Sequence, residues 1–170
     1  MSKRAIIVVD IQNEYFSGGK LPLEGIEKAA ANAAKVIEHA RSAKDLVIYF
    51  QHESADPEIP FFTPGTPEVA IHSMVEPLEQ EKVVVKNFPN SFRETGLKAL
   101  LDEQSIEEVV IIGAMSHMCI DATSRAASDF GYKTTIIQDA CATLDLEFEG
   151  ATVPASQVHA TIMAALAFAY

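Results

Sequence analysis

The sequence predicts an α/β protein in which a mostly parallel, doubly wound sheet lies between two layers of helices, with Rossmann-like topology. Short apolar runs rich in β-branched residues alternate along the chain with longer segments of helical spacing. Apolar runs without internal alternation are typical of strands buried on both faces, as in parallel sheets. Strands separated by helices need right-handed crossovers, which place helices on both faces. The length of 170 residues fits a single domain, residues 1–170.

The individual elements follow from the apolar runs and from the Gly and Pro residues between them. Strands are expected over residues 5–10, 46–50, 83–86, 108–112 and 133–138. Helices are expected over residues 24–43, 94–103, 119–130 and 154–169. Residues 51–67 contain four prolines and Gly65 and are expected to form a long loop. Loops of this length in compact domains are often functional.

Composition limits the class of protein and of partner. The formal net charge of −11 argues against nucleic-acid binding, because neutralising phosphates requires clustered Lys and Arg. No segment approaches the roughly 20 apolar residues of a membrane span, so no membrane partner is expected. Cys119 and Cys141 are read as thiols of a cytoplasmic protein, not as a disulfide framework. The remaining partner class is a small-molecule substrate.

Reactive side chains follow the predicted strands at one edge of the sheet. Asp10 ends the first strand, His52 follows the second, and Lys86 ends the third. The fourth strand leads through Gly113 and a polar turn to Cys119. In open parallel sheets, ligands bind beyond the carboxyl ends of the strands. The convergence of an acid, a base, a thiol and a histidine there favours an enzyme.

Cys119 is the candidate nucleophile, because it opens a predicted helix directly after a strand and a tight turn. Free N–H groups and the helix dipole at such a position favour the thiolate and can stabilise an oxyanion. The alternative is a small buried apolar residue, which is the ordinary role of a free cysteine. Cys141 is expected to have that structural role.

Asp10 and Lys86 are the candidate acid–base partners of the thiol. A carboxylate at the end of a buried strand can take the proton of Cys119 and pass it to a leaving group. The alternative for Asp10 is a cap on the following turn. Lys86 can stabilise both the carboxylate and the thiolate, whereas a lone Lys at a strand end is usually solvated.

Other residues are candidates for substrate contact. His52 stands at the expected edge and could touch substrate or a metal, but no neighbouring ligand pair accompanies it, so no metal is expected. Nucleotide binding has no support, because the first strand is followed by neither a GxGxxG nor a P-loop motif. Loop phenylalanines could line an apolar pocket or simply pack. The further substrate-contact candidates are Asn13, Phe16, Phe88, Ser91 and His117, and the loop also carries Phe61 and Phe62.

Four segments together resemble the isochorismatase-like superfamily, in its cysteine hydrolase branch of nicotinamidase-related amidohydrolases. They are VVDIQNEYF, VVVKNFPNSF, GAMSHMCIDATSRAASDFGY and QDACAT, in the family's order and spacing. The resemblance implies a catalytic triad of Asp10, Lys86 and Cys119. It also implies a non-proline cis peptide at Ala114–Met115, with the N–H groups of Met115 and Cys119 forming the oxyanion hole. Homodimers or homotetramers are common in the family.

Two comparisons with that family sharpen the expected function. Nicotinamidases hold a metal through an Asp-x-His pair after the second strand, whereas this chain has QHESADPE, so neither a metal cofactor nor nicotinamide is expected. The retained Cys119 favours an acyl-enzyme and cleavage of a C–N bond in a small amide, ureide or carbamoyl compound. One alternative is an isochorismatase-type vinyl-ether hydrolase using Asp10 and Lys86. Another is a non-catalytic flavodoxin-like binding or signalling domain, although Ile11 and Gln12 replace the acidic residues of a phospho-receiver.

Overall fold

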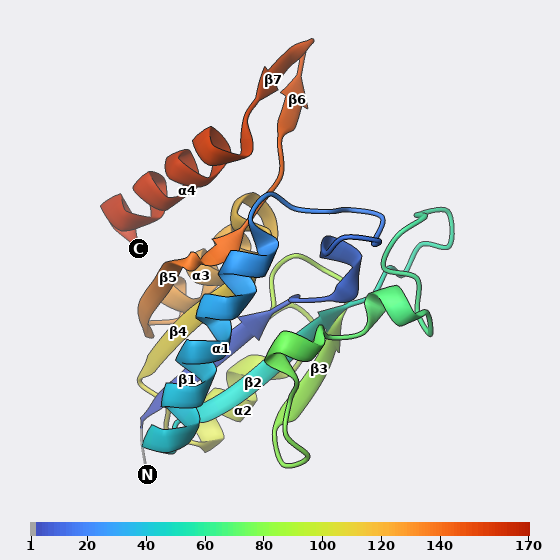
Figure 1. Cartoon of the computed structure of the whole chain (residues 1–170). Helices are drawn as coiled ribbons and strands as arrows, with labels where there is room; N and C mark the ends of the chain where they lie inside the picture. Colours follow the sequence, from blue (N-terminus) through green and yellow to red (C-terminus); the bar gives the residue numbers. More distant parts are fainter. Residues whose placement is uncertain (1–2) are drawn as a thin grey trace.

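The computed structural model describes residues 3–170, whose centre is a five-stranded parallel sheet flanked by helices (Figure 1). The strand order is β3-β2-β1-β4-β5, and each neighbouring pair is parallel. The strands are β1 (Arg4–Val9), β2 (Leu46–His52), β3 (Lys82–Lys86), β4 (Glu108–Ala114) and β5 (Lys133–Ala142). The predicted fold class is confirmed, and the order places β1 at the centre with its neighbours added on both sides.

Helices bury the two faces of the sheet in separate apolar cores. Helix α1 (Ile26–Ala43) packs its buried alanines and isoleucines against one face, with Ile6 and Val8 of β1. Helices α2 (Leu97–Glu103) and α3 (Asp121–Asp129) cover the other face, with Ile7 and Val9 of the same strand. Because successive residues of a strand point to opposite faces, the continuous apolar run of β1 serves both cores.

The C-terminal part of the chain lies at the edge of the fold, and Met163 of its helix packs against the core that contains Ile7 and Val9. Helix α4 (Ala155–Ala169) buries only three residues and contacts α3 and the turn that carries Cys119. Before it, β6 (Leu146–Phe148) and β7 (Ala151–Val153) form an antiparallel hairpin that projects from the body (Figure 1). Phe148 in this hairpin is 74% exposed. This hairpin was not predicted from the sequence, because its two strands of three residues each leave too short a pattern.

Element ends differ from the sequence expectation where local backbone conformation intervenes. Helix α2 begins at Leu97, because Glu94 and Gly96 both have positive φ. A single turn of π-helix, η4 (Ser116–Ile120), precedes α3, so Cys119 lies in that turn. The long loop, predicted from residue 51, begins only after His52 because β2 continues to that residue. It is irregular up to Thr66 and is followed by the short helices η2 (Pro67–Val69) and η3 (Ser73–Val75).

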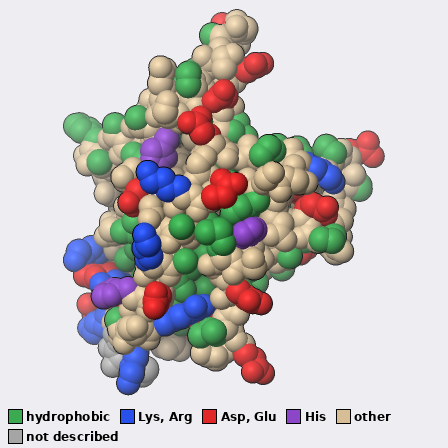
Figure 2. Space-filling view, viewed as in Figure 1, with side chains coloured by type: hydrophobic (Ala, Val, Ile, Leu, Met, Phe, Trp, Pro, Cys, Tyr) green, Lys and Arg blue, Asp and Glu red, His purple; other side chains and the backbone are tan. Residues whose placement is uncertain are grey.

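The surface carries many acidic side chains, which are spread over the face seen in Figure 2 and do not gather at one point. Among the described residues, no helix combines the length and the apolar character needed to cross a membrane.

Candidate active site

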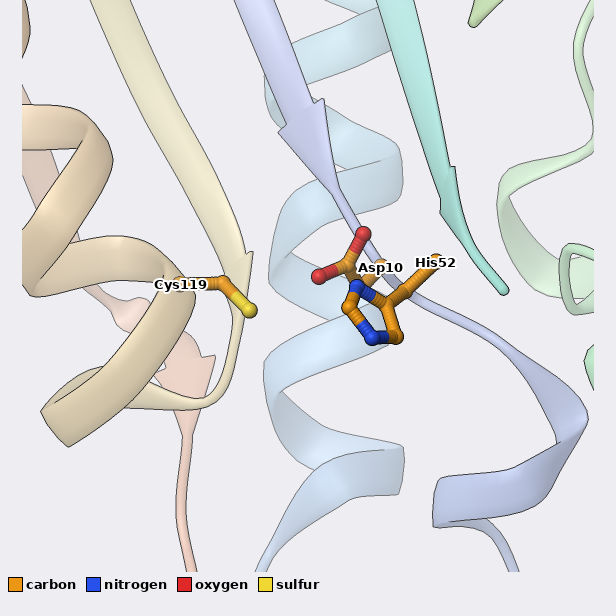
Figure 3. A group of neighbouring side chains, drawn as sticks. All are labelled: Asp10, His52 and Cys119. Carbon is orange, nitrogen blue, oxygen red and sulfur yellow. The ribbon is translucent and has the colours of Figure 1, made fainter. Parts of the chain in front are cut away.

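Asp10, Lys86 and Cys119 meet at the carboxyl edge of the sheet, and all three are buried. Asp10 follows β1 directly with a φ of 52°, a left-handed conformation uncommon for residues other than glycine and often found at functional sites. Lys86 ends β3, and the strand register pairs it with His52 at the end of β2. Cys119 projects from η4 after β4. Figure 3 shows the Asp10 carboxylate between the Cys119 sulfur and the His52 ring.

The Lys86 ammonium is the centre of the cluster. Its Nζ lies 2.7 Å from Asp10 Oδ2 and 3.3 Å from Cys119 Sγ. It also lies 3.2 Å from His52 Nδ1 and donates to the carbonyl oxygen of Phe88 at 3.1 Å. Because an ammonium has donors only, His52 Nδ1 is an acceptor in this contact and its proton resides on Nε2. Lys86 therefore joins the ends of β1, β2 and β3 to the cysteine turn.

The electrostatics of the cluster correct one expectation, that the thiolate of Cys119 would be favoured. Burial, and then the charge of Asp10, raise the pKa of the Cys119 thiol above its usual range, although Lys86 opposes them. Burial alone would lower the pKa of Lys86, but Asp10 and Cys119 outweigh burial and raise it. The resting cluster thus holds a carboxylate, an ammonium and a neutral thiol. The charges of Asp10 and Lys86 already balance one another, so a thiolate at Cys119 would add a buried negative charge without a compensating cation.

The Asp10 carboxylate retains capacity to accept a proton. It forms the ion pair with Lys86, yet neither oxygen receives a hydrogen bond of ordinary geometry from any described residue. Buried carboxylate oxygens are normally hydrogen-bonded, and the exceptions are often functional. This acceptor stands beside the thiol whose proton must leave before the sulfur can act as a nucleophile.

Asp10, His52 and Cys119 also offer ligand atoms close enough together to hold a metal ion. Lys86 Nζ, however, contacts all three residues, so its positive charge takes the place in which a bound cation would lie. Burial, followed by the charge of Lys86, lowers the pKa of His52 and keeps its ring neutral. The donor set is therefore suited to an internal ammonium and does not fit a metal while Lys86 is charged.

The turn between β4 and Cys119 depends on Gly113. A Cβ at this position would lie 1.9 Å from the carbonyl oxygen of Val9, so only glycine permits the close approach of β4 to β1. The following Ala114–Met115 peptide bond is cis. The carbonyl oxygen of Met115 then accepts hydrogen bonds from the N–H groups of Met118 and Ile120, which closes the turn around Cys119.

The other residues predicted to contact substrate differ in whether they contact the catalytic cluster. The carbonyl oxygen of Phe88 accepts a hydrogen bond from Lys86, whereas the centroid of its ring lies 3.5 Å from Cζ of the Arg93 guanidinium. The Ser91 hydroxyl is buried and accepts a hydrogen bond from Thr123 at 2.9 Å. His117, two residues before Cys119, is hydrogen-bonded through Nδ1 to Thr143 at 2.7 Å. Ser91 therefore has a structural contact, linking α3 to the segment after β3.

Asn13 and Phe16 make their side-chain contacts with the segment of residues 67–72. The Asn13 side chain donates to the carbonyl oxygen of Pro67 at 2.9 Å. The Phe16 ring stacks on His72 with 3.6 Å between ring centroids. None of the contacts described for these two side chains involves Asp10, Lys86 or Cys119. His159 bonds the buried Ser116 hydroxyl at 2.8 Å and so links α4 to η4. Burial raises the pKa of Cys141 to about 12, in keeping with a structural thiol.

Three residues around the site, Gln12, Glu14 and Tyr15, were not singled out from sequence, whereas Phe62 was named as a loop phenylalanine that could line a pocket. The buried Gln12 side chain bonds both the N–H and the carbonyl oxygen of His52, at 2.8 and 2.9 Å. The buried Glu14 carboxylate accepts the N–H of Phe62 at 2.7 Å and that of Lys20 at 3.0 Å. Phe62 packs edge-on against both Tyr15 and His52. Gln12 and Glu14 stand between buried apolar residues directly after the first strand. This pattern was the sequence signal that could have identified them.

Comparisons with known proteins identify the family of the chain and agree with its fold. The chain matches the family model described as Isochorismatase domain over residues 4–165. It is 49% identical over 162 residues to the uncharacterized isochorismatase family protein YddQ of Bacillus subtilis, covering 95% of this chain and 90% of that protein. A crystal structure of an isochorismatase hydrolase from Oleispira antarctica has a TM-score of 0.93 and 51% identity, covering 98% and 90% of the two chains. N-carbamoylsarcosine amidase from Thermoplasma acidophilum has a TM-score of 0.76 and 28% identity, covering 84% and 85%.

Proposed function

The chain belongs to the isochorismatase family of hydrolases, and on that basis we propose that it is a cysteine hydrolase of small amides, ureides or carbamoyl compounds. The observation that carries the proposal is the buried Asp10–Lys86–Cys119 cluster, with a proton acceptor, a cation and a thiol in contact. An amidase among the solved relatives supports C–N bond cleavage.

In the proposed reaction, Asp10 takes the proton of the Cys119 thiol as the sulfur attacks the substrate carbonyl carbon. Because Cys119 is neutral at rest, this transfer moves the negative charge from the carboxylate to the sulfur without adding charge to the site. Lys86 contacts both groups and can stabilise the charge in either place. The N–H groups of Met115 and Cys119 are proposed to bind the oxyanion.

The remaining steps return each group to its starting state. Protonated Asp10 gives its proton to the departing nitrogen, the C–N bond breaks, and a thioester on Cys119 remains. Asp10 then takes a proton from water as the water oxygen attacks the thioester carbonyl. The carbon–sulfur bond breaks, the acid leaves, and the proton on Asp10 returns to the sulfur. Lys86 remains an ammonium throughout.

The test is ammonia release from a panel of small amides, ureides and carbamoyl compounds. Replacing Cys119 with Ala is expected to lower turnover on the order of 10⁴-fold or more, because the nucleophile of an acyl-transfer site is not replaced by its neighbours. Cys141→Ala is the matched control, since Cys141 is also a buried thiol and should keep nearly full activity. Undiminished hydrolysis by the Cys119 variant would contradict the covalent mechanism and point to chemistry by Asp10 and Lys86 alone.

We also infer self-association and a reducing, cytoplasmic location. Support for self-association comes from α4, where Phe168 is 92% exposed and residues 154–170 contain no Lys, Arg, Asp or Glu. In the view of Figure 2, the arm formed by α4 displays apolar side chains. A homodimer or homotetramer would cover them. The two free thiols support the cytoplasmic location.

A further inference from the structure

The Lys86 ammonium has more acceptors around it than it has hydrogens to donate. Its Nζ lies within 3.3 Å of acceptors on four described residues, which are Asp10 Oδ2, the carbonyl oxygen of Phe88, His52 Nδ1 and Cys119 Sγ. An ammonium carries three hydrogens, so these four acceptors cannot each receive one. The two oxygen atoms have the shorter contacts, at 2.7 and 3.1 Å, and His52 and Cys119 are left to share the third hydrogen.

The resting state of the cluster determines which of these two residues receives the third hydrogen. Burial, and then the charge of Asp10, raise the pKa of the Cys119 thiol, so the resting sulfur is neutral and a weak acceptor. Burial, and then the charge of Lys86, lower the pKa of His52, so its ring is neutral and the lone pair of Nδ1 is available. At rest, the third hydrogen of Lys86 is therefore bound by His52.

The His52 ring is fixed in the orientation that this hydrogen bond needs. The Gln12 side chain bonds both the backbone N–H and the carbonyl oxygen of His52, and the strand register pairs His52 with Lys86. The Phe62 ring packs edge-on against the imidazole with 5.1 Å between centroids. In Figure 3, one ring nitrogen of His52 is turned toward the Asp10 carboxylate and the other lies on the far side of the ring. Nδ1 is therefore an acceptor that the fold holds in place beside the ammonium.

We propose that His52 is a positioning residue that withholds the third Lys86 hydrogen from Cys119 at rest and yields it when the sulfur becomes charged. As Asp10 takes the thiol proton, the sulfur changes from a weak acceptor into a strong one, and the Lys86 hydrogen bond is redirected from Nδ1 to Sγ. Lys86 keeps its charge throughout. His52 thereby helps to keep the resting thiol protonated and weakly reactive. The inference rests on the proposed function for the transfer of the proton from Cys119 to Asp10.

Two substitutions of nearly equal size test this role. His52→Asn keeps an acceptor oxygen where the wild type has Nδ1, whereas His52→Leu has only a methyl group there. Alkylation by iodoacetamide at one mildly alkaline pH is followed by mass spectrometry at Cys119 and at Cys141, the second buried thiol. The ratio of the two rates is the measured quantity, because a general opening of the structure would raise both rates.

The rate of Cys119 relative to Cys141 is expected to be about tenfold higher in His52→Leu than in His52→Asn, the size of one hydrogen bond. The reason is that the third Lys86 hydrogen then has no acceptor other than the sulfur. His52→Asn should keep the wild-type ratio. His52→Gln is a second variant without an acceptor at the Nδ1 position, because its amide lies where Nε2 lies, and it should react like His52→Leu. It carries the test if the Leu variant does not fold.

Equal ratios in the Asn variant and in the variants without the acceptor would overturn the proposal, because a residue with only a packing role does not distinguish them. A lower ratio in His52→Leu or His52→Gln would also overturn it, since His52 would then direct Lys86 toward the sulfur. The alkylation readout needs no turnover. Its failure is therefore distinct from a failure of the hydrolysis test with Cys119→Ala.

Discussion

Gly113 has the strictest requirement of any glycine in the site region. It lies where β4 passes the end of β1, immediately before the turn to Cys119, and its φ is 127°. The space for a side chain is filled by the backbone of Val9 and not by a flexible side chain. A substitution there must move one of the two strands whose ends carry Asp10 and the cysteine turn.

Replacing Gly113 with Ala is expected to lower the free energy of unfolding by roughly 3 kcal/mol or more, through overlap with Val9 and the positive φ. Gly131→Ala is the matched control. Gly131 also has a positive φ, of 89°, but nothing lies within 4 Å of its missing Cβ. That variant should lose only about 1–2 kcal/mol, from the left-handed conformation. Urea denaturation measures both, and equal losses would contradict the role of the close approach.

The sequence was sufficient to identify the candidate catalytic residues but not to predict their protonation states. Asp10, Lys86 and Cys119 could be placed together because the ends of parallel strands share one edge. The protonated state of Cys119 depends on its burial and on the distance of each charge from its sulfur, which no spacing in the sequence encodes.

Among the elements, the loop after β2 owes its position to two side chains of the segment after β1. Gln12 bonds His52 at the start of the loop and the carbonyl oxygen of Val69 beyond it, the latter at 2.6 Å. Glu14 holds the middle of the loop through the N–H of Phe62. The loop therefore has no regular structure of its own and takes its shape from buried polar groups.

Replacing Glu14 with Gln is expected to loosen this loop and to cost about 1–3 kcal/mol, because an amide offers one acceptor oxygen where the carboxylate offers two. Limited proteolysis within residues 53–66 should become faster, and the melting temperature should fall. Glu58→Gln, in the exposed part of the same loop, removes the same charge and should change neither. Equal proteolysis of the two variants would show that Glu14 does not anchor the loop.

The sequence pattern predicted the long buried elements correctly but did not predict the short ones. All five strands of the main sheet and the four α-helices were predicted. Strands buried on both faces leave continuous apolar runs, and helices buried on one face leave apolar residues at helical spacing. The β6–β7 hairpin was missed, since almost all of its residues are exposed and its strands have three residues each. The π-helical turn at Cys119 was also missed, because its spacing is close to that of an α-helix.

Considered as a whole, the molecule is asymmetric in polarity. Its formal charge of −11 resides outside the last 17 residues, from Pro154 to Tyr170. Helix α4 has exposed apolar residues on the side that faces away from α3, and the projecting hairpin adds the exposed Phe148. Two acidic copies would repel one another on most faces, so a charge-free surface is the favourable place for them to meet.

Light scattering during gel filtration tests this inference. The wild type should have the mass of a dimer or tetramer, and Phe168→Lys should raise the dissociation constant at least about tenfold, as expected for loss of a central apolar contact. Leu78→Lys, at an exposed apolar residue far along the chain from α4, should keep the wild-type mass. A monomeric wild type over the accessible concentrations would reject self-association.

The central position of β1 also determines when the chain can acquire its chemistry. Asp10 is made early in synthesis, whereas Lys86 and Cys119 come from the middle and later parts of the chain. Their meeting requires β1 to pair with strands formed much later, and such distant contacts form slowly. A partly folded chain therefore has the three side chains but not the cluster. Under the proposed mechanism, hydrolysis through Cys119 is an activity that the polypeptide gains only on completing its sheet.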